Sequence, residues 1–538
     1  MMEIYEMVAK TFMGLEKVLA EELTALGAQD VQEGNRMVSF RGDKETMYKA
    51  NFCCRTALRI LKPIHTLTAS NADELYDALR TFDWSQIMSA NSTFCIDSTV
   101  YSEEFRHSKY VTYRMKDAIV DFFTEKCGKR PNVVTHNADL MFDVHIAGRE
   151  VTISLDSSGE PLYKRGWRVG QTDAPINEVL AAGIILLSGW KGESNFVDPM
   201  CGSGTFLIEA AMIANNIYPG VYRKGFAFER WSDFDPDIFD AICSDDSQER
   251  DFQHHIYGSD ISADAIAIAS RNIAGASVGK YITLERRDIN DITEAPEKGV
   301  LVTNPPYGER IRVSDMEGLY ETLGSKLKNV YKGYSAWVIS SSFDLFKAIH
   351  LKASVRYPLM NGSLECELRQ FEMFDGSYDD LRREGGSIKN EDFKRSERSK
   401  GTLYEKKDDR PRDRRDFRDN REPRENREPR ERSERGERSE RGEYRERREP
   451  RDRKFGDRRE NREPRSERRP YPHRNNIGHD GKVHSREFSD SVVRFRQPIL
   501  GNDNEQKTER RQRIGWRRND TNPDTNPKPQ NPSPENEE

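Results

Sequence analysis

Apolar positions in the first part of the chain change their spacing from one short segment to the next. Leu15, Val18 and Leu19 recur three and four residues apart within residues 14–26, which predicts a helix with one apolar face, and Gly27 follows at a common helix-ending position. The same criteria predict helices at 43–55, 72–88 and 109–126 and strands at 4–9, 37–41, 94–100, 139–146 and 150–155. Helices and strands mixed in this way predict an α+β region over about the first 156 residues.

From about residue 175, helices alternate with short apolar strands. The predicted strands cover 195–198, 255–260, 283–287, 299–304, 336–340, 354–358 and 365–371. The predicted helices between them cover 177–188, 206–215, 263–275 and 317–331. This alternation predicts an α/β fold with a mostly parallel, seven-stranded sheet covered by helices on both faces. Asn361 and Gly362 give a strong hairpin signal, which predicts that the last two strands form an antiparallel pair.

The composition of the chain changes near residue 380. Over all 538 residues, 35% are hydrophobic and 33% are charged, with a net charge of −6, but beyond Lys389 the chain is almost entirely Arg, Glu, Asp, Pro, Ser and Gly. Such a segment buries too little apolar surface to offset the entropy lost on ordering, so residues 380–538 are predicted to be disordered. This tail is either a solubilising segment or an arginine-rich arm that adds salt-sensitive contacts to RNA phosphates, an attraction that its glutamates would weaken.

Cysteine spacing and apolar runs restrict the class of protein. The seven cysteines form no Cys-x-x-Cys pair and no Cys/His metal spacing, which favours thiols in a reducing compartment and predicts no metal site. The N-terminal MMEIYEMVAKTF lacks the basic-then-apolar pattern of a signal peptide. No apolar run reaches the length of about 18 residues that a membrane-spanning helix requires. We therefore expect a cytoplasmic protein with no membrane partner.

A glycine-containing turn follows the first strand of the predicted parallel sheet, in the sequence FVDPMCGSGTF. Pro199 stops the strand after Asp198, Gly202 and Gly204 lack Cβ atoms, and Thr205 begins a helix. The N-terminus of that helix presents free N–H groups and suits a carboxylate or a phosphate. The Walker and GxGxxG spacings are both absent, which disfavours phosphate transfer. The alternative interpretation is a glycine turn without a ligand.

Two further acids stand at the ends of the next strands. Asp260 ends HIYGSD, and Asp288 follows LERR. Open α/β sheets bind ligands at the carboxyl ends of their strands, where Asp260 suits the two hydroxyls of a ribose and Asp288 could accept a hydrogen bond from an adenine amine. Either acid could instead be only a helix cap or a turn former.

A proline corner ends a later strand, in LVTNPPYG. The apolar run 300–303 leads into Asn304, Pro305, Pro306 and Tyr307, where the prolines cannot continue a strand. Together with DPMCGSGT and the acid after the second strand, this corner resembles the class I S-adenosylmethionine-dependent methyltransferases that modify exocyclic amines.

Within that class the chain most resembles the guanine-N2 methyltransferases of large-subunit ribosomal RNA, which carry an N-terminal THUMP domain that binds RNA. The segments FMGLEKVLAEELTALGA, SKYVTYRMKDAIVDFF, SLDSSGEPLYKRGWR and APINEVLAAGIILLSGW are similar to the family pattern in wording and order, and the resemblance covers about residues 3–375. It implies a ferredoxin-like subdomain over 1–60, a THUMP domain over 61–156 and a Rossmann-like catalytic domain over 157–376.

By this resemblance, the proline corner would hold the substrate. The side-chain carbonyl of Asn304 and the backbone carbonyl of Pro305 would accept hydrogen bonds from a guanine amine, so that its lone pair points at the sulfonium methyl. Pro306 would stiffen the turn, and Tyr307 would stack on a base flipped out of its helix. Good alignment can supply roughly 7–11 kcal/mol of the barrier, so the reaction requires no metal and no strong base. The alternative interpretation is a rigid loop that ends a strand.

The resemblance also implies S-adenosylmethionine as the cofactor and a set of residues that bind it. The residues assigned to this set are Asn177, Glu178, Asp198, Pro199, Cys201, Gly202, Gly204, Thr205, Asp260, Ile261, Asp288 and Ile289. The glycine-turn members would line the methionine end of the cofactor. Capping and surface roles are equally open for Asn177 and Glu178.

Two basic clusters are candidates for contact with RNA. Lys164, Arg165 and Arg168 surround Trp167 at the domain junction and could follow the RNA backbone, or they could form an ordinary linker surface. The second cluster lies around the predicted helix 109–126, where the candidate phosphate contacts are Arg106, His107, Lys109, Arg114 and Lys116. A solvated helix face is the alternative there.

The expected activity is methyl transfer to the exocyclic N2 amine of a guanine in large-subunit (23S) ribosomal RNA. Transfer RNA is an alternative substrate, since THUMP domains serve both. An adenine-specific DNA methyltransferase would share NPPY, but the accessory domain and the arginine-rich tail disfavour it. From another class, a non-catalytic RNA-binding assembly factor is the alternative. Some relatives continue into a second methyltransferase domain, whereas here the charged tail has no second glycine turn or proline corner, so one reaction is expected.

Overall fold

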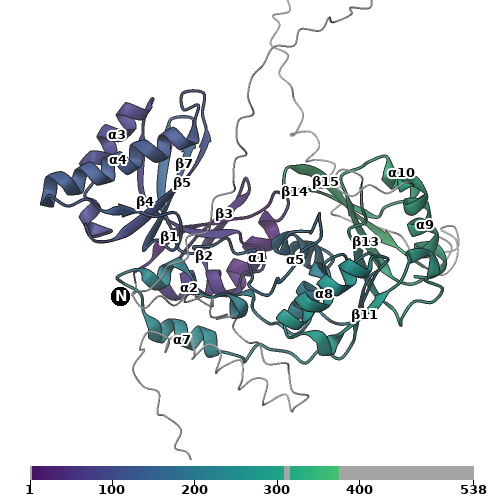
Figure 1. The fold of residues 1–538 in the computed structure, drawn as a ribbon. Helices are drawn as coiled ribbons and strands as arrows, with labels where there is room; N and C mark the ends of the chain where they lie inside the picture. The colour runs from purple at the N-terminus through teal and green to yellow at the C-terminus, as the bar shows by residue number, and fades with distance from the viewer. Residues whose placement is uncertain (1–2, 308–314, 375–538) are drawn as a thin grey trace, which may run out of the picture. The chain divides into compact units, whose positions relative to one another are not determined.

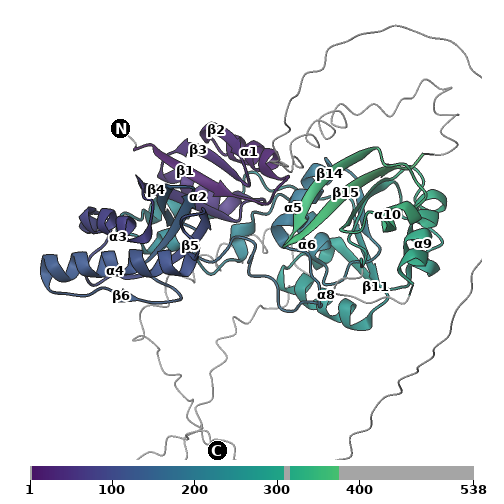
Figure 2. The same ribbon diagram turned by 90° about the horizontal axis from the view of Figure 1, so that it is seen from above.

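The computed structural model describes residues 3–307 and 315–374 (Figures 1 and 2). The prediction of disorder over residues 380–538 falls outside this part of the chain. Within the described ranges, no helix has both the length and the apolar character needed to cross a membrane. The described strands form one eight-stranded and one seven-stranded sheet.

The eight-stranded sheet is built from the first 156 residues and has the strand order β2-β3-β1-β4-β8-β7-β5-β6. Its strands are β1 (Tyr5–Lys10), β2 (Gln29–Gly34), β3 (Met37–Gly42), β4 (Arg59–Thr68), β5 (Thr93–Tyr101), β6 (Asn132–Val133), β7 (Leu140–Ala147) and β8 (Glu150–Asp156). The helices are α1 (Glu16–Ala25), α2 (Lys44–Cys53), α3 (Ala72–Thr81) and α4 (Ser108–Cys127). α3 and α4 lie side by side (Figure 1), and α4 packs on β5. The predicted helices and strands of this region are present, but the helix predicted over 72–88 ends at Thr81 and a short 3-10 turn follows it.

Strand β4 crosses the boundary that the sequence places after residue 60. It pairs with β1 on one side and with β8 on the other, so both parts of the N-terminal region share one sheet. This strand is not among those predicted from the sequence. Pro63 has no N–H to donate and is unusual in an inner strand, and the register shifts between Pro63 and His65. β2, with the sequence QDVQEG, is also absent from the expected elements, since an exposed edge strand needs few apolar residues.

The seven-stranded sheet has the strand order β11-β10-β9-β12-β13-β15-β14. Its strands are β9 (Asn195–Asp198), β10 (Ile256–Asp260), β11 (Ile282–Arg286), β12 (Gly299–Thr303), β13 (Ser335–Ser340), β14 (Val355–Asn361) and β15 (Leu364–Glu372). The first five in this order are parallel, and β15 and β14 are antiparallel, as the Asn361-Gly362 turn predicts. The helices are α5 (Glu178–Leu187), α6 (Thr205–Ala214), α7 (Pro236–Ser244), α8 (Ala263–Gly275), α9 (Met316–Asn329) and α10 (Leu345–Ala348).

Alternate residues of these strands enter different cores. Phe196, Val302 and Ile339 pack with α5, α6 and α8 on one face, whereas Val197 and Leu301 pack with α9 and α10 on the other. Because successive side chains of a strand point to opposite faces, two buried faces require an uninterrupted apolar run such as Val300–Thr303. The continuous apolar runs in the strands of this region are therefore explained by a sheet that is covered on both sides.

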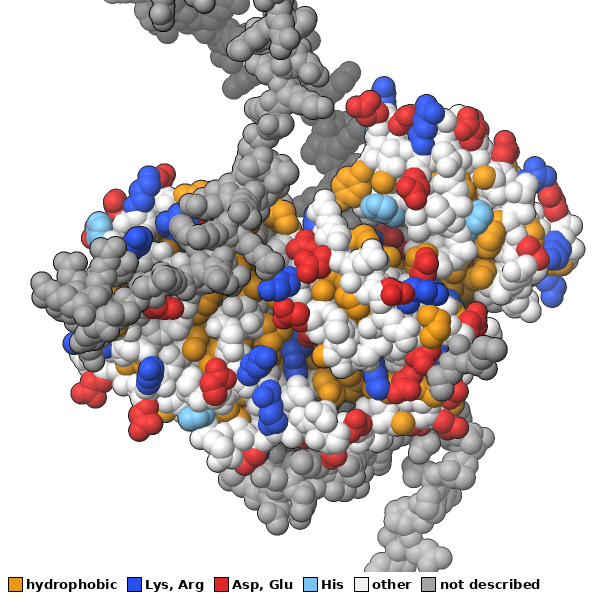
Figure 3. Space-filling model, turned by 180° about the vertical axis from the view of Figure 1, so that it is seen from behind, with side chains coloured by type: hydrophobic (Ala, Val, Ile, Leu, Met, Phe, Trp, Pro, Cys, Tyr) orange, Lys and Arg blue, Asp and Glu red, His pale blue; other side chains and the backbone are white. Residues whose placement is uncertain are grey.

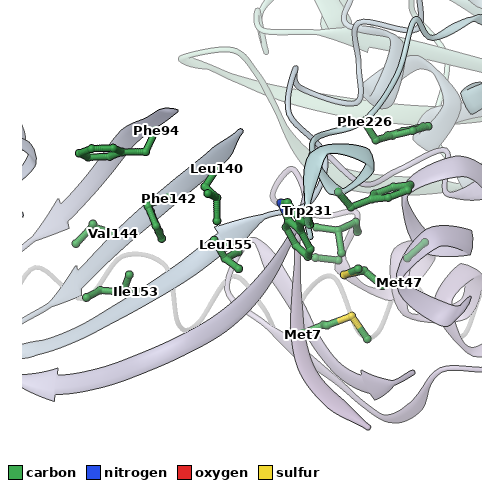
Figure 4. Close-up of a cluster of buried hydrophobic side chains, with 14 of the residues drawn as sticks. Met7, Met47, Phe94, Leu140, Phe142, Val144, Ile153, Leu155, Phe226 and Trp231 are labelled. Atoms are coloured by element: carbon green, nitrogen blue, oxygen red, sulfur yellow. The ribbon is translucent and has the colours of Figure 1, made fainter. Parts of the chain in front are cut away.

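The segment between α6 and β10 does not belong to the core of the parallel sheet. Its residues Phe226, Trp231 and Phe239 join the hydrophobic cluster of the eight-stranded sheet and of α2. Figure 4 shows part of this cluster, which includes Phe226 and Trp231 as well as side chains of the N-terminal strands. Tyr48 of α2 stacks on Phe228 with ring centroids 4.3 Å apart. An insertion of the catalytic region thus completes the core of the N-terminal region, which the sequence pattern did not reveal.

Candidate active site

A cavity of about 990 Å³ opens at the carboxyl ends of strands β9, β10 and β12 and brings the three predicted motifs together. The predicted site residues that line it are Asp198, Pro199, Cys201, Gly202, Thr205, Asp260, Ile261, Asp288, Ile289, Asn304, Pro305, Pro306 and Tyr307. β9 lies between β10 and β12 in the sheet, so the glycine turn, Asp260 and the proline corner are neighbours although they are distant in sequence. Their shared position follows from strand order, which no local pattern encodes.

The two glycines of the turn have different structural roles. Both have positive φ, +52° for Gly202 and +78° for Gly204, a conformation that other residues rarely adopt. A Cβ on Gly202 would meet only Thr172 Oγ1, at 3.9 Å, so this position borders open space. A Cβ on Gly204 would lie 3.2 Å from the Ala269 Cβ, so this glycine allows the start of α6 to approach α8. Gly204 is absent from the cavity lining, so its contact with the cofactor stays a prediction.

Asp198 joins the glycine turn to the proline corner. It is buried at the end of β9, and its Oδ1 accepts hydrogen bonds from Thr303 Oγ1 at 2.8 Å and from the Met200 N–H at 3.2 Å. Thr303 is the last residue of β12 and immediately precedes Asn304. Burial raises the pKa of Asp198 to about 7, although both hydrogen bonds act to lower it. Asp198 is therefore a carboxyl group that changes its charge near neutral pH.

Asp260 and Asp288 both border the cavity and both also shape the backbone. Asp260 Oδ2 accepts from the Gly202 N–H at 2.9 Å, and Oδ1 accepts from the Ser262 N–H at 2.9 Å. The N-terminal cap of α8 is Ser262 and not Asp260. Asp260 therefore holds the glycine turn and does not cap the start of that helix. Asp288 Oδ1 accepts from the Asn290 N–H at 2.9 Å, which is the turn-forming role named as its alternative. Each carboxylate oxygen has further lone pairs for a ligand.

The proline corner contains a buried acceptor without a donor. Among the described residues, no donor reaches Asn304 Oδ1, although this oxygen is withdrawn from solvent. Such an acceptor costs about 1–3 kcal/mol, so a ligand N–H that reached it would recover that energy. Tyr307 lies partly buried at the other end of the corner, and its hydroxyl accepts a hydrogen bond from Asn361 Nδ2 at 2.9 Å. The β14–β15 hairpin thereby fixes the orientation of the tyrosine ring.

Besides Gly204, two predicted cofactor residues lie outside the cavity lining. The side chain of Asn177 caps α5, because its Oδ1 accepts from the Val179 N–H at 2.9 Å. Glu178 is buried and forms an ion pair with Arg168 at 2.6 Å. The structure therefore gives Asn177 the capping role. Glu178 pairs with Arg168, which in turn bonds to the carbonyl of Ile176.

The basic cluster at the domain junction points inward. Arg165 is 1% exposed, and its guanidinium contacts Glu209 at 3.4 Å and the backbone oxygens of Leu162 and Arg55. The prediction that Arg165 contacts RNA is therefore wrong, since a buried, paired guanidinium cannot reach a phosphate. Arg168 is partly exposed, and its guanidinium bonds to Glu178 and to residues of the glycine turn, so its contact with RNA stays a prediction. Only Lys164 of this cluster is at the surface, where it pairs with Glu160.

The cluster around α4 behaves differently. Arg106, His107 and Lys109 are exposed, whereas Arg114 and Lys116 are partly buried. Arg114 pairs with Asp73 and lies over the ring of Tyr76, with its guanidinium carbon 4.4 Å from the ring centroid. Lys116 pairs with Asp117. The available positive charge is thus concentrated before and at the start of α4.

Sequence reasoning missed two parts of the cavity wall. One is the segment 171–176, and the other is the start of α9, which contributes Asp315, Gly318 and Leu319. Neither carries a local signal, because nothing in the two stretches distinguishes them from an ordinary loop and an ordinary helix start. Among the described residues, no group of three or more His, Cys, Asp or Glu is arranged to hold a metal ion.

Comparison with known proteins gives matches along the described chain. The RlmL ferredoxin-like domain matches residues 6–61, the THUMP domain 69–156, and the RMKL-like methyltransferase domain 165–370. A Synechocystis protein provisionally named an RNA methyltransferase is 36% identical over 364 residues, which are 67% of this chain and 95% of that protein. The chain belongs to this family of THUMP-containing RNA methyltransferases.

Two further members of the family define the likeness more closely. The ribosomal RNA large subunit methyltransferase K/L of Syntrophotalea carbinolica is 37% identical over 374 residues, 67% of this chain and 52% of that protein. The chain thus spans about half the length of this relative. A provisionally assigned methyltransferase solved in complex with SAH is 30% identical, with a TM-score of 0.62 and coverage of 70% of this chain and all of that chain.

Family membership makes this protein a methyltransferase with S-adenosylmethionine as its methyl donor. The cavity of this chain suits such a donor on two counts. The open space beside Gly202 leaves room for the close approach of a ligand, and the acidic side chains of Asp198 and Asp260 suit its cationic and hydroxyl groups.

Proposed function

We propose that this methyltransferase modifies the exocyclic N2 amine of a guanine in large-subunit ribosomal RNA. The observation that carries the proposal is the unpartnered, buried Asn304 Oδ1, which borders the same cavity as the glycine turn and is adjacent to Thr303, the partner of Asp198. The matched THUMP domain supports RNA as the substrate, and the relatives named as large-subunit K/L enzymes support ribosomal RNA.

The bound donor would supply an electrophilic methyl group attached to a sulfonium. Asp198, Gly202 and Thr205 would hold the methionine part, Asp260 the ribose hydroxyls, and Asp288 with Ile289 the adenine. Ile261 is 62% exposed and lines the cavity, so it offers an apolar surface that a flat adenine ring would cover. Gly202 leaves the backbone open for that approach.

The proline corner would orient the substrate amine. A guanine amine is a weak nucleophile because its lone pair is delocalised into the ring. Asn304 Oδ1 and the Pro305 carbonyl would accept its two hydrogens and turn the lone pair toward the methyl group. Pro305 and Pro306 fix the corner before the substrate arrives, and well-oriented reactants save roughly 7–11 kcal/mol of the barrier.

The substrate guanine must leave its stack to reach the cavity, as bases do in other enzymes that modify them. Tyr307 is the aromatic side chain of the proline corner and would stack on the flipped base. Its hydroxyl is already bonded to Asn361, so the ring needs no large rearrangement to receive the base. The exposed Arg106 and Lys109 near α4 would contact phosphates of the surrounding RNA, with Lys164 as a further surface contact.

Transfer RNA is a second candidate substrate, because a THUMP domain alone does not distinguish the two RNA classes. The seven cysteines lie in the described part of the chain and form no disulfide there, which supports action in the reducing cytoplasm, where ribosomal RNA is made. A non-catalytic assembly role would leave the enclosed Asn304 acceptor without a purpose.

The decisive experiment removes the Asn304 acceptor. Asn304→Ala is expected to lower methyl transfer by at least about 100-fold, within the range that positioned catalytic groups contribute, while RNA and S-adenosylhomocysteine affinities stay unchanged. Ser342→Ala, an exchange in the loop after β13 and outside the cavity lining, is the control for the loss of a polar side chain. Activity of Asn304→Ala equal to that of the control would contradict the mechanism.

The substrate is tested by mapping N2-methylguanine by mass spectrometry in RNA from cells with and without this gene product. Loss of one modified guanine from large-subunit ribosomal RNA is expected. Loss from a transfer RNA would assign the second candidate, and unchanged guanine modification in both RNAs would contradict the proposed function.

A further inference from the structure

One wall of the cofactor cavity is a segment without regular secondary structure, residues 169–176, here called the wall segment. Its residues from Gln171 to Ile176 border the cavity, and Thr172 lies beside the glycine turn at Gly202. A segment of this kind has no helix or strand ladder to hold its backbone in place. Hydrogen bonds from two side chains outside the segment, Asn272 and Arg168, hold it instead.

Asn272 holds the first end of the wall segment. It lies on α8, is fully buried, and makes four hydrogen bonds to backbone groups. Its Oδ1 accepts from the N–H groups of Val169 at 2.8 Å and Gly170 at 3.0 Å. Its Nδ2 donates to the carbonyls of Gly170 at 2.9 Å and Ser203 at 3.0 Å. One amide thus saturates its bonding capacity and joins the wall segment to the glycine turn.

Arg168 holds the other end. Its Nη2 donates to the Ile176 carbonyl at 3.4 Å and to Thr205 Oγ1 at 2.9 Å, and its Nη1 donates to Ser203 Oγ at 3.1 Å. Glu178 accepts from Nε at 2.6 Å and neutralises the partly buried guanidinium. Arg168 therefore also bonds to both the wall segment and the glycine turn.

We propose that Asn272 and Arg168 are positioning residues that clamp the wall segment to the glycine turn and so set the affinity for the methyl donor. Each residue bonds to the wall segment and to the glycine turn, so two anchors hold these neighbouring parts of the cavity lining together. Neither touches the reacting atoms, because neither borders the cavity. The clamp rests on the assignment of this cavity to the cofactor and is independent of which RNA is modified.

The clamp predicts a particular kinetic signature. Loss of Asn272 lets the wall segment move away from the turn in the free protein, so binding must include the cost of ordering it again. That cost weakens donor and product binding alike, which raises KM for the donor and leaves kcat at saturating donor nearly unchanged. A purely structural role would lower stability without this separation.

The test compares Asn272→Ala with Asn215→Ala. Asn215 is also a buried asparagine whose amide bonds to backbone groups, those of Ala211 and Phe252, but it lies outside the cavity lining. Calorimetric titration with S-adenosylhomocysteine is expected to show about tenfold weaker binding for Asn272→Ala, equivalent to about 1.4 kcal/mol. Asn215→Ala is expected to bind as the unsubstituted protein does. Equal affinities of the two variants would overturn the proposal.

Hydrogen exchange gives a readout that does not depend on the cofactor. The amides of Val169 and Gly170 are expected to exchange faster in Asn272→Ala and to stay protected in Asn215→Ala. Arg168→Lys keeps the charge opposite Glu178 but cannot reproduce the fork of bonds, so it is the second variant should Asn272→Ala fold poorly. Arg168→Lys is expected to bind S-adenosylhomocysteine several-fold more weakly, and unchanged binding would overturn the clamp.

Asp260→Ala separates failure of the clamp from failure of the cofactor assignment. If Asp260→Ala binds S-adenosylhomocysteine as tightly as the unsubstituted protein, this cavity is not the cofactor site, and the clamp proposal falls with that assignment. If Asp260→Ala binds weakly while Asn272→Ala and Arg168→Lys bind normally, the cavity assignment stands and the clamp alone is wrong.

Discussion

Basic residues in the catalytic region and around the start of the THUMP helix α4 look alike in sequence and have opposite surroundings in the structure. Arg165 and Arg168 are paired with Glu209 and Glu178 and hold backbone in place, whereas Arg106 and Lys109 face solvent. The face in Figure 3 shows the usual surface arrangement, with acidic and basic side chains interspersed. A run of basic residues therefore indicates positive charge, but it does not tell whether the side chains point into the protein or to solvent. Only side chains that face solvent can contact RNA.

Substitution of a buried charge should have the largest effect on stability. Arg165→Met leaves Glu209 buried without its partner, and breaking a buried pair in this way typically costs about 3–5 kcal/mol. We expect a loss of that size in the free energy of unfolding, measured by urea denaturation. Burial raises the pKa of Glu209, so the unpaired acid is expected to take up a proton and recover part of the loss at low pH.

The double variant Arg165→Met/Glu209→Leu is the control, since replacing both charges by apolar groups removes the unpaired acid. It should recover most of the lost stability. RNA affinity of the folded protein should be the same in all three forms. Weaker RNA binding by a stable double variant would show that Arg165 contributes to RNA binding after all.

Asp198 extends the comparison to pH. Its folded-state pKa is about 7, above the usual Asp value, so between these values the folded state binds more protons than the unfolded state. Its contribution to stability therefore falls as pH rises toward 7 and is lost above it, by about 1.4 kcal/mol for each unit of pKa difference. Thermal denaturation of the ligand-free protein should show this fall, and Asp198→Asn should flatten it.

A cation bound in the cavity should lower the pKa of Asp198, whereas burial raises it. The donor carries a positive charge, so its binding should lower the pKa of Asp198 and release a proton near pH 7. Titration calorimetry in two buffers of different ionisation enthalpy measures this release. The same proton release in Asp198→Asn would assign it to another group.

The exposed charges should show a smaller effect and one confined to RNA. Each phosphate contact removed from Arg106 or Lys109 is expected to reduce the slope of log affinity against log salt by about 0.7–0.9. The double variant to Ala should keep its free energy of unfolding. Arg80→Ala is the matched control, because Arg80 lies in the same region and is already paired with Glu125. An equal change of slope in this control would remove the distinction between paired and unpaired charge.

Lys164→Ala should have the smallest effect. Lys164 is at the surface and pairs with Glu160 four residues earlier, and exposed ion pairs contribute about 0.2–1 kcal/mol. We expect a change of that order in unfolding free energy and at most one phosphate contact in RNA titrations. A large loss of stability would place Lys164 with its buried neighbours instead of at the surface.

The sequence by itself determined the elements whose periodicity is strong. The apolar run Val300–Thr303 and the turn Asn361-Gly362 predicted a buried parallel strand and a final hairpin, because both faces of the sheet are covered and the turn requires a positive φ, which Gly362 has. It also predicted the chemistry at the strand ends, since Asp198, Asp260 and Asn304 all border one cavity.

Only the tertiary structure decided which residues of these motifs line the cavity and which instead pack against or bond to other parts of the protein. Gly204 meets α8, Glu178 pairs with Arg168, and Asn272 ties two loops together, although each is polar or glycine within a motif-rich stretch. The physical reason is that these roles depend on which backbone from a distant segment lies within hydrogen-bonding distance. Strand order and helix packing fix that proximity, and neither is encoded in the local period of the chain.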